Sequence, residues 1–487
     1  MSSIKTTLCC IAAITAAAFA HTHARATTSP WDEAAVILAR IKAPQFPARD
    51  FVITHAPYNA TPGATADAAP DATRAIARAI ADCHAAGGGR VVVPAGIFLT
   101  GPVTLKSNVN LHIAKGATLL FKTDHAAFPI VPVRWEGIEC MNFQPLIYAW
   151  KQENIAVTGE GTLDGGATHD NWWSHKKKPA PGEPPRPSGP ADSNARLGEM
   201  AAANIPVEQR IFGAGHTLRP AFIQPHHCKN VLIEGVTILR SPFWEITPVY
   251  CENVTIRRVN VSSHGPNNDG CDPDSCRDVL IEDCVFDTGD DCIAIKSGRN
   301  HDGRRVNRIV ENIIIRRCVM KDGHGGVVMG SEIAAGCRNV FVEDCRMDSP
   351  KLERALRFKS NAARGGVIEN IHMRNITIGQ VAEAIITVDF LYQEGPNGPF
   401  SPVVRNVSLE NVTSAKSPRV FYIANIPSGT IDDIRLKNCV FNGIETAEVV
   451  SGAGRIILEN VKLIPAKPPR SLDKGAWERE SAKKKKP

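Results

Sequence analysis

One short phrase recurs along the second half of the chain, and it limits the possible fold more than any other feature. Each copy has an Asn or Asp, then alternating apolar residues, a polar pair and a second alternating run. The copies begin at Cys228, Cys251, Cys276, Val310, Cys337, Ile368, Val404 and Ile431, with a degraded copy at Gly454. Alternation with a period of two predicts strands with one buried face. A strand unit that recurs at intervals of roughly 22 to 36 residues predicts a solenoid.

The residue types in these copies favour strands over helical repeats. No copy has apolar residues at helical spacing over three turns, and Val, Ile and Thr dominate. We therefore predict an all-β fold, a right-handed single-stranded parallel β-helix in which each coil adds one rung to several sheets. Rungs about 4.8 Å apart would stack equivalent positions into ladders. The Asn and Asp of the copies would form one ladder at a turn, bonding to backbone there: Asn230, Asn253, Asp278, Asn312, Asn339, Asn370, Asn406 and Asp433.

The cysteines follow the same pattern. Fourteen are present, of which Cys9 and Cys10 lie in the N-terminal apolar run. Several others stand where further copies have Val or Ile, and a cysteine at such an inward position acts as a small hydrophobic residue. These are Cys228, Cys251, Cys276, Cys284, Cys318, Cys337, Cys345 and Cys439. We therefore favour buried free thiols over a disulfide framework, and leave open the state of Cys83, Cys140, Cys271 and Cys292.

The two ends of the chain have the composition of segments outside the β-helix. Lys5, the apolar run from Leu8 to Ala20 and small residues up to Ala26 predict a signal peptide over residues 1–26. The run is too short for a membrane anchor, so we expect an exported protein, periplasmic or extracellular, with no membrane partner. The β-helix is expected over residues 31–465 and a disordered basic tail over residues 466–487.

The charge of the chain gives no support for a nucleic-acid partner. The formal net charge is +6, and Lys483–Lys486 alone supply four of these charges. Such a run is usually a solvated tail, and the rest of the chain is close to neutral. We expect a monomer whose affinity for any acidic ligand comes from a local site.

The first half of the chain supplies a cap, early coils and one long interruption. Thr73–Ala85 is Ala-rich, has Ile76 and Ile80 four residues apart and is followed by three glycines, which predicts a short helix that caps the open end of the core. Strands are expected at residues 90–94 and 109–121, and a rung at 154–163. Residues 164–222 form a long inserted loop, either one wall of a cleft or a floppy excursion.

Polar groups interrupt the later copies, each after an apolar rung: Asp269, Asp290 with Asp291, His324, and Arg357 with Lys359. Asp290 follows Asp278 by twelve residues (290 − 278), and His324 follows Asn312 by twelve (324 − 312), so the two occupy equivalent places on neighbouring coils. Taken singly, these residues could be surface-turn or calcium-loop residues. Their recurrence at one edge of consecutive coils predicts a groove lined by acids, an imidazole and cations. Neighbouring strand residues point to opposite faces, so Asp290 and Asp291 require a bend, which Gly289 would permit.

These motifs resemble those of the polygalacturonases, glycoside hydrolase family 28, on a pectate-lyase-like β-helix. The matching motifs are Asn267-Asn268-Asp269, Gly289-Asp290-Asp291, Gly323-His324-Gly325 and Arg357-Phe358-Lys359. The resemblance implies that Asp290 protonates the glycosidic oxygen, that Asp269 and Asp291 activate a water, and that His324 tunes the acid. This inverting scheme needs carboxyl groups about 6.5–9.5 Å apart, and crowded carboxylates should raise the pKa of the acid. No metal and no cofactor is implied.

The same resemblance implies an acidic polysaccharide, polygalacturonate or pectin, as the ligand. Arg357 and Lys359 would bind the carboxylate of a galacturonate unit. Asn267 and Lys296, which begin and end the central stretch, and Tyr392 are the further substrate-binding candidates. The long insertion and a likeness to bacterial exo-acting members favour attack at chain ends.

Other activities stay open at this point. An endo-polygalacturonase or a rhamnogalacturonan hydrolase would use the same residues. A pectate lyase shares the fold and places calcium on clustered carboxylates, with an Arg as base. A non-catalytic carbohydrate-binding β-helix would need no acid at Asp290.

Overall fold

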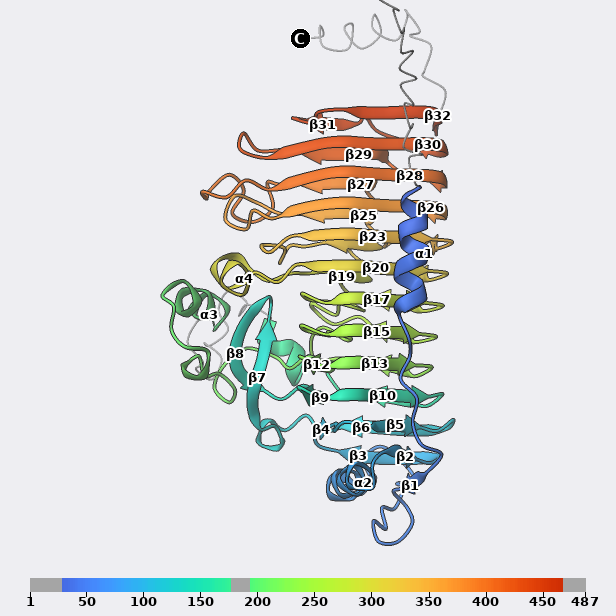
Figure 1. The fold of residues 1–487 in the computed structure, drawn as a ribbon, viewed down its shortest axis with the longest axis vertical. Coiled ribbons are helices and arrows are strands. Elements are labelled where there is room, and N and C mark those ends of the chain that lie inside the picture. The colour runs from blue at the N-terminus through green and yellow to red at the C-terminus, as the bar shows by residue number, and fades with distance from the viewer. Residues whose placement is uncertain (1–28, 177–192, 467–487) are drawn as a thin grey trace, which may run out of the picture.

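The computed structural model describes residues 29–176 and 193–466, which form a parallel β-helix (Figure 1). The predicted fold class is thereby confirmed. The predicted signal peptide and all but the first residue of the predicted basic tail lie outside the described residues. Among the described residues, no helix is long and apolar enough to cross a membrane.

The longest ladder of strands runs the full height of the stack, and every pairing in it is parallel. The predicted repeats supply its later rungs. In order of pairing it contains β1 (Asp50–Val52), β2 (Gly89–Val93), β5 (Val109–Ile113), β10 (Glu153–Gly159), β13 (Lys229–Glu234), β15 (Glu252–Arg257), β17 (Arg277–Glu282), β20 (Val310–Arg316), β23 (Cys337–Glu343), β26 (Val367–Gln380), β28 (Val403–Lys416), β30 (Thr430–Ile444) and β32 (Ile456–Pro465).

Two further ladders complete the coils. The second contains β3 (Gly96–Thr100), β6 (Ala117–Phe121), β11 (Thr162–Asp164), β14 (Thr237–Leu239), β16 (Asn260–Ser263), β18 (Val285–Thr288), β21 (Val319–Met320) and β24 (Arg346–Met347). The third contains β4 (Val103–Thr104), β9 (Ile147–Trp150), β12 (Ile223–His226), β19 (Ile293–Ile295), β22 (Val327–Met329), β25 (Arg354–Lys359), β27 (Ala384–Asp389), β29 (Arg419–Ala424) and β31 (Val449–Ser451). Between β12 and β19 this third ladder continues as single bridges through Ile246 and Cys271.

Helices and one hairpin lie outside the coils (Figure 1). The helices are α1 (Pro30–Arg40), α2 (Thr73–Ala85), α3 (Ser193–Ala202) and α4 (Asn300–Val306), with 3-10 turns η1 (His125–Ala127), η2 (Trp172–Lys176) and η3 (Val207–Gln209). The antiparallel hairpin joins β7 (Ile130–Trp135) and β8 (Ile138–Phe143). The predicted capping helix is confirmed as α2, and its buried residues Ile76 and Ile80 join the core of the first coils.

Helix α1 was not predicted, and it lies lengthwise against the outside of several coils (Figure 1). A capping box at Ser29 and Pro30 at its first position start it. Its Ile37 belongs to an apolar cluster that also contains residues of three successive rungs, Leu280, Ile314 and Phe341. The helix therefore covers an outer face that the repeats alone leave apolar.

The predicted ladder of Asn and Asp is present, but its bonds differ from those expected. Each member adopts a left-handed backbone, with φ between 53° and 61°, and most are joined side chain to side chain rather than to the backbone. The amide of Asn339 donates to Asn312 at 3.1 Å, and the amide of Asn370 donates to Asn339 at 3.0 Å. Asn is the non-glycine residue that best tolerates this conformation, and in a stack each amide can serve as donor and acceptor.

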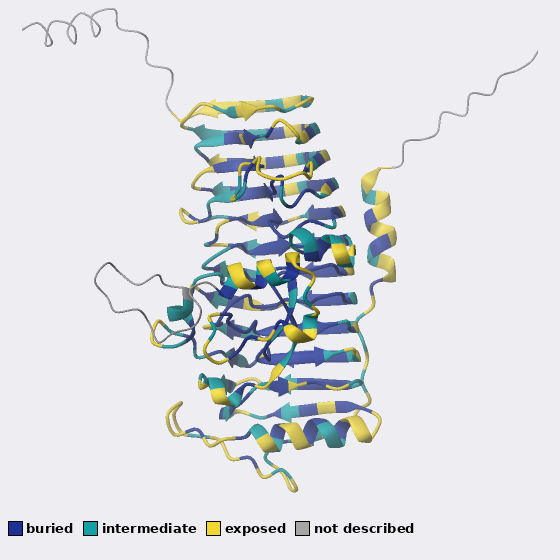
Figure 2. Cartoon of the chain, turned by 90° about the vertical axis from the view of Figure 1, so that its left-hand side faces the viewer, coloured by how far each residue is buried: buried dark blue, intermediate teal, exposed yellow. Residues whose placement is uncertain are grey.

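The core is the apolar interior of the coils, shown in dark blue in Figure 2. The twelve cysteines within the described residues are all buried, and all are free thiols, including the four left open by the sequence. The Sγ atoms of several of them point at backbone carbonyls of their own or the preceding coil, as at Cys284 and Cys439. They pack as small hydrophobic residues, as predicted.

The Asn ladder yields a prediction for stability. Asn339→Ala removes the two ladder bonds of Asn339 and forces alanine into a left-handed backbone, which costs about 1–2 kcal/mol for a residue with a Cβ, besides about 1 kcal/mol for each lost hydrogen bond. Asn339→Gly loses the same bonds but tolerates the backbone. Urea denaturation should therefore show the alanine variant to be less stable than the glycine variant. Equal losses would mean that the left-handed conformation contributes nothing.

Candidate active site

Consecutive coils bring the predicted acids, imidazole and cations to one face of the β-helix. Asp269 lies just before Cys271, whose rung bridges to Ile293. Asp290 and Asp291 lie in the turn between β18 and β19. His324 lies between β21 and β22, and Arg357 and Lys359 lie on β25. Because β19, β22 and β25 pair in register, these residues occupy adjacent rungs.

Three carboxylates form the centre of the site. One oxygen from each of Asp269, Asp290 and Asp291 lies within 4.8 Å of the others. The side chain of Asp291 is fully buried and that of Asp269 is 5% exposed, whereas Asp290 is 18% exposed. An inverting enzyme is expected to hold its carboxyl groups about 6.5–9.5 Å apart. The three oxygens of this cluster lie closer together than that.

The adjacent aspartates reach one groove because neither belongs to a strand. The residues between β18 and β19 are irregular, so strand alternation does not apply to them. The amide of Asp291 donates to Oδ1 of Asp290 at 3.0 Å, and Thr288 donates to the carbonyl of Asp290 at 2.9 Å. Gly289 has a different role from the one predicted: a Cβ there would lie 2.5 Å from the carbonyl oxygen of Gly265. Glycine is needed because two coils touch at this position.

Asp290 and His324 form a hydrogen-bonded pair at the mouth of the site. Nδ1 of His324 lies 2.9 Å from Oδ1 of Asp290, and its Nε2 lies 4.0 Å from Glu353. Burial raises the pKa of Asp290, but the hydrogen bond and charge of His324 outweigh it and lower that pKa to about 2. The hydrogen bond that His324 donates to Asp290 in turn raises the pKa of His324 above 6.5. Between the pKa of Asp290 and the raised pKa of His324, the pair therefore holds one proton, which resides on the imidazole when no substrate is bound.

The two cations of β25 hold Asp291. Nζ of Lys359 lies 2.5 Å from Oδ2 of Asp291, and a guanidinium nitrogen of Arg357 lies 3.5 Å from Oδ1. Tyr392 lies beside both cations, with its ring centre 5.6 Å from Nζ of Lys359 and 5.9 Å from the guanidinium carbon of Arg357. All three predicted residues are thus brought together. The cations lie beside both Asp291 and the aromatic ring.

Asp269 belongs to a buried charge network that the sequence did not reveal. Lys296, only 2% exposed, lies 3.5 Å from Asp269, 3.9 Å from Asp272 and 3.3 Å from Glu332, and its Nζ lies 4.3 Å from the ring centre of Trp244. Burial raises the pKa of Asp269 well above its usual value, and the charges of Asp272 and Asp290 add to this. Burial, with the crowded acids adding to it, therefore raises the pKa of Asp269. The pKa of Asp290, which was predicted to be raised, is lowered.

Lys296, predicted to bind substrate, makes its observed contacts within this network. Neither carboxylate oxygen of Asp272 or Glu245 has a hydrogen-bond partner among the described residues, although both side chains are fully buried. Burial raises the pKa of Glu245 and of Asp272 well above the usual range for carboxyl groups. No motif marks these two acids, because the ionisable groups that act on them come from other coils.

Asn267 and Asn268 have separate tasks in the turn before Asp269. Oδ1 of Asn267 accepts from Arg219 at 2.8 Å. Asn268 is fully buried, and its amide donates to the carbonyls of Ser241 and Phe243 at 3.1 and 3.0 Å. Asn268 therefore fixes the turn that presents Asp269, while Asn267 lies nearer the surface.

The β7–β8 hairpin and helix α3 form a wall on one side of the site. The turn of the β7–β8 hairpin, Glu136–Gly137, fits against Arg299 and Glu332, because a Cβ at Gly137 would lie 2.7 Å from the Arg299 amide. Glu136 also pairs with Arg299 at 2.9 Å. Helix α3, from the long insertion, joins the hairpin through a small core that includes Leu197 and Trp135. The predicted insertion thus supplies part of this wall, but the hairpin that carries it was missed.

Comparisons with known proteins agree with this site. The family model "Glycosyl hydrolases family 28" matches residues 213–453. A crystal structure of a hyperthermoactive exopolygalacturonase from Thermotoga maritima is 39% identical, covers 90% of this chain and 96% of its own, and superposes with a TM-score of 0.84. The β-helix, the motifs and these likenesses define a carbohydrate-cleaving β-helix enzyme. The chain belongs to glycoside hydrolase family 28, as predicted.

Two curated relatives extend the comparison. A "Probable polygalacturonase" of Vitis vinifera is 27% identical over 365 residues, 72% of this chain. An "Exo-poly-alpha-D-galacturonosidase" of Dickeya chrysanthemi is 28% identical over 389 residues, 76% of this chain. The matched regions span 66% and 61% of the lengths of these two relatives.

The paired His324 and Asp290 make stability depend on pH. Because the pKa of Asp290 is lowered from 3.8 to about 2, its contribution is present above about pH 4 and is lost as the pH falls towards 2. Because the pKa of His324 is raised above 6.5, its contribution is complete below pH 6.5 and is lost as the pH rises through the folded-state value. The stability difference between wild type and His324→Gln should thus be largest between about pH 4 and 6.5.

Urea denaturation across the pH range measures this difference. His84→Gln serves as the control, since His84 is exposed and meets a backbone carbonyl rather than a carboxylate. A His324→Gln deficit that stays constant with pH would contradict the pairing.

Proposed function

We propose that the protein is a polygalacturonase that hydrolyses α-1,4-galacturonosidic bonds in polygalacturonate, and that it acts from chain ends. The observation that carries this proposal is the juxtaposition of three carboxylates within 4.8 Å with two cations beside them. Carboxylates supply acid and base, and the cations match a substrate that carries one carboxylate per sugar. We also propose that it is exported and acts as a monomer, with Asn267 and Lys296 in the substrate site.

The close carboxylates suit the activation of one water. Two hydrogen bonds of about 2.8 Å from one water, opening at a near-tetrahedral angle, span about 4.5 Å. A water held between Asp269 and Asp291 would thus fit the separation of their nearest oxygens. One of the two carboxylates takes a proton from this water as the water oxygen attacks the anomeric carbon. The bond from that carbon to the leaving glycosidic oxygen breaks on the opposite face of the sugar. The ion pairs of Lys359 and Arg357 fix Asp291 for this task.

Asp290 delivers the proton to the leaving oxygen, with His324 as its source. It is the most exposed of the three carboxylates, and it shares one proton with His324. When a sugar displaces water from the groove, the charged pair loses solvation, which favours transfer of the proton from Nδ1 to the carboxylate. Asp290 then protonates the glycosidic oxygen. His324 thus keeps a proton available at pH values where an isolated carboxyl group would have lost it.

Chain-end attack is supported by the wall beside the site. The hairpin turn at Gly137 lies against Glu332, which in turn lies 3.3 Å from Lys296 and so within reach of Asp269. A polysaccharide that enters the groove would meet this wall after few subsites. The likenesses to an exopolygalacturonase from Thermotoga maritima and an exo-poly-α-D-galacturonosidase from Dickeya chrysanthemi point the same way.

The roles of the aspartates can be separated with substrates of different leaving-group ability. Asp290→Asn should lower kcat on polygalacturonate by about 10²–10⁴-fold but retain most of its rate on an aryl galacturonide, whose phenol leaves without protonation. Asp269→Asn should lose both activities, because it acts on the water. If Asp269→Asn instead kept its rate on the aryl galacturonide and Asp290→Asn lost both activities, Asp269 would be the acid and Asp290 would act on the water.

The product profile tests chain-end attack. Polygalacturonate should release monomer or one short product from the first minutes, and ¹H NMR of the fresh product should show the β anomer, as inversion of an α bond requires. An initial ladder of oligomers would instead mean internal attack. A retained α anomer would rule out inversion, and an unsaturated product absorbing in the ultraviolet would identify a lyase.

A further inference from the structure

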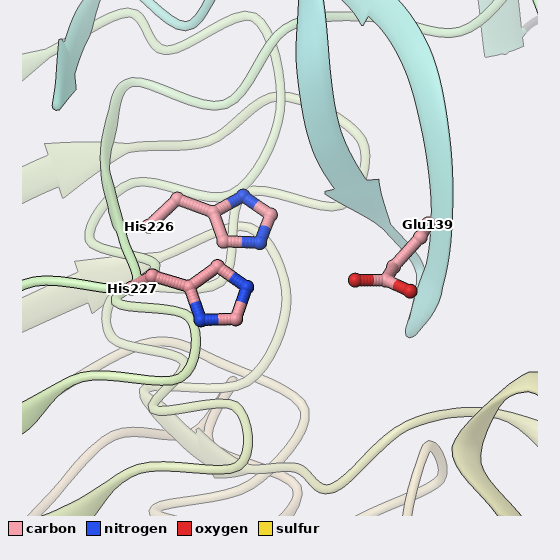
Figure 3. Close-up of side chains that lie close together, drawn as sticks. All are labelled: Glu139, His226 and His227. Atoms are coloured by element: carbon pink, nitrogen blue, oxygen red, sulfur yellow. The ribbon is translucent and has the colours of Figure 1, made fainter. Parts of the chain in front are cut away.

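A second cluster of ionisable side chains lies away from the catalytic carboxylates. His226 ends β12, His227 follows it, and Glu139 lies on β8 of the hairpin. One ring nitrogen from each histidine and one oxygen of Glu139 lie within 4.8 Å of one another. Figure 3 shows the two imidazole rings side by side, facing the carboxylate across a gap. The mechanism uses none of these three residues.

The backbone brings the two neighbouring rings to the same side. Side chains of successive strand residues point to opposite faces, but His227 has a φ of 55°. Its ring therefore stacks on that of His226, with centroids 5.0 Å apart and planes 18° apart. The same left-handed backbone recurs at the equivalent turn position of neighbouring coils, at Lys151, Tyr250 and Ser275, so the turn itself supplies this geometry.

His226 is the observation that points to a ligand. It is 1% exposed, and neither of its ring nitrogens has a hydrogen-bond partner among the described residues. Other histidines within the coils have one: His112 lies 3.0 Å from the hydroxyl of Thr158, and His372 lies 2.7 Å from that of Ser408. A buried polar group without a partner costs free energy unless something binds it.

We propose that His226, His227 and Glu139 form a binding site for a divalent transition-metal ion of the zinc class. Two imidazoles and a carboxylate are ligands that zinc accepts and that calcium and magnesium, which prefer oxygen, do not. In a tetrahedral zinc site with bonds of about 2.0–2.1 Å, ligand atoms lie about 3.4 Å apart, so the exposed His227 and the partly exposed Glu139 close on the ion. The fourth ligand position of the ion, on the side open to solvent, would be taken by a water molecule.

The protonation state of the histidines suits this ligand. Burial lowers the pKa of His226 well below 6.5, with the charges of His227 and Arg134 adding to the effect, and burial also lowers the pKa of His227. Burial thus favours the neutral imidazole, which is the form that binds a metal ion.

Neighbouring cations limit the affinity. Arg305 forms an ion pair with Oε2 of Glu139, and the charges of Arg134, Lys151 and Arg308 reach the histidines. Arg134 is itself paired with Asp274 at 2.9 Å, and Arg305 is also paired with Asp302 at 2.9 Å. Glu139 therefore offers Oε1 to the ion. The expected affinity is lower than that of a structural zinc site with several thiolates.

A bound ion would join the hairpin to the coil below it. Glu139 belongs to the wall of the groove, and His226 and His227 belong to a rung of the third ladder. The ion would thus fix the wall, and its binding would raise thermal stability by mass action because the unfolded chain lacks the site.

The test uses the full-length protein without a histidine tag, after treatment with a chelator and dialysis. Titration calorimetry with ZnCl₂ should show one binding event for wild type, with a rise in Tm, and none with MgCl₂. His227→Gln and Glu139→Gln, at positions that are exposed or partly exposed, should bind at least about tenfold more weakly. The matched control, His55→Gln, replaces another exposed histidine and should behave as wild type.

A cobalt spectrum identifies the ligands. Co²⁺ bound as proposed should give visible d–d bands without thiolate charge-transfer absorption, and His227→Gln should abolish those bands. Absence of zinc binding by wild type, unchanged binding by His227→Gln, or a thiolate signal from one of the buried cysteines would each overturn the proposal. Because no substrate is present, these results are independent of the hydrolytic activity.

Discussion

The candidate active site of this protein depends on the in-register stacking of one coil on the next. A parallel ladder repeats each position at about the spacing of neighbouring strands, near 4.8 Å. That distance is close to the reach of a hydrogen bond or an ion pair between side chains. Asp269, Asp291 and Lys359 are far apart in the sequence, yet the rungs place them together. The stacked amides of Asn312 and Asn339 use the same spacing for structure alone.

The site is also shaped by charges that have been removed from water. Asp269, Asp291, Lys296 and Lys359 are all nearly inaccessible to solvent. Removing a single member of a buried ion pair costs about 3–5 kcal/mol, because its partner is left uncompensated. Substitutions in this network will therefore act on folding as well as on catalysis. The aryl galacturonide comparison matters for this reason, since it asks about one chemical step in variants that still fold.

Much of the fold and of the candidate site could be predicted from the sequence, because both depend on local sequence patterns. Alternation within each copy marks strands, and glycine-flanked motifs mark the turns that carry Asp290 and His324. Helix α2 was predicted with its observed limits. The hairpin was missed, although Glu136-Gly137 between apolar runs, with φ of 42° and 75°, is the kind of two-residue turn that signals one. The role of Gly289 was also misjudged, because the contact that demands glycine comes from another coil.

The pKa pattern could not be predicted, because it arises between coils. The crowding of acids predicted that one carboxyl group would have a raised pKa. Which group this is depends on the side chains beside each carboxyl group. Asp290 has an imidazole beside it, whereas Asp269 lies among Asp272 and other buried acids. Glu245, Asp272 and Glu332 have no motif of their own, and only the fold shows that they lie under the groove.

Helix α1 changes how such a stack should come apart. In a solenoid each coil touches only its neighbours, so stability is nearly a sum of local terms and ends can unravel one coil at a time. Helix α1 joins rungs that do not touch one another: Ile37 shares an apolar cluster with Leu280 and Phe341, and Arg40 pairs with Asp278 at 2.6 Å. It thereby adds longer-range coupling to a quasi-one-dimensional chain. The coils that carry Asp291, His324 and Lys359 should open together, as one cooperative unit, rather than by fraying.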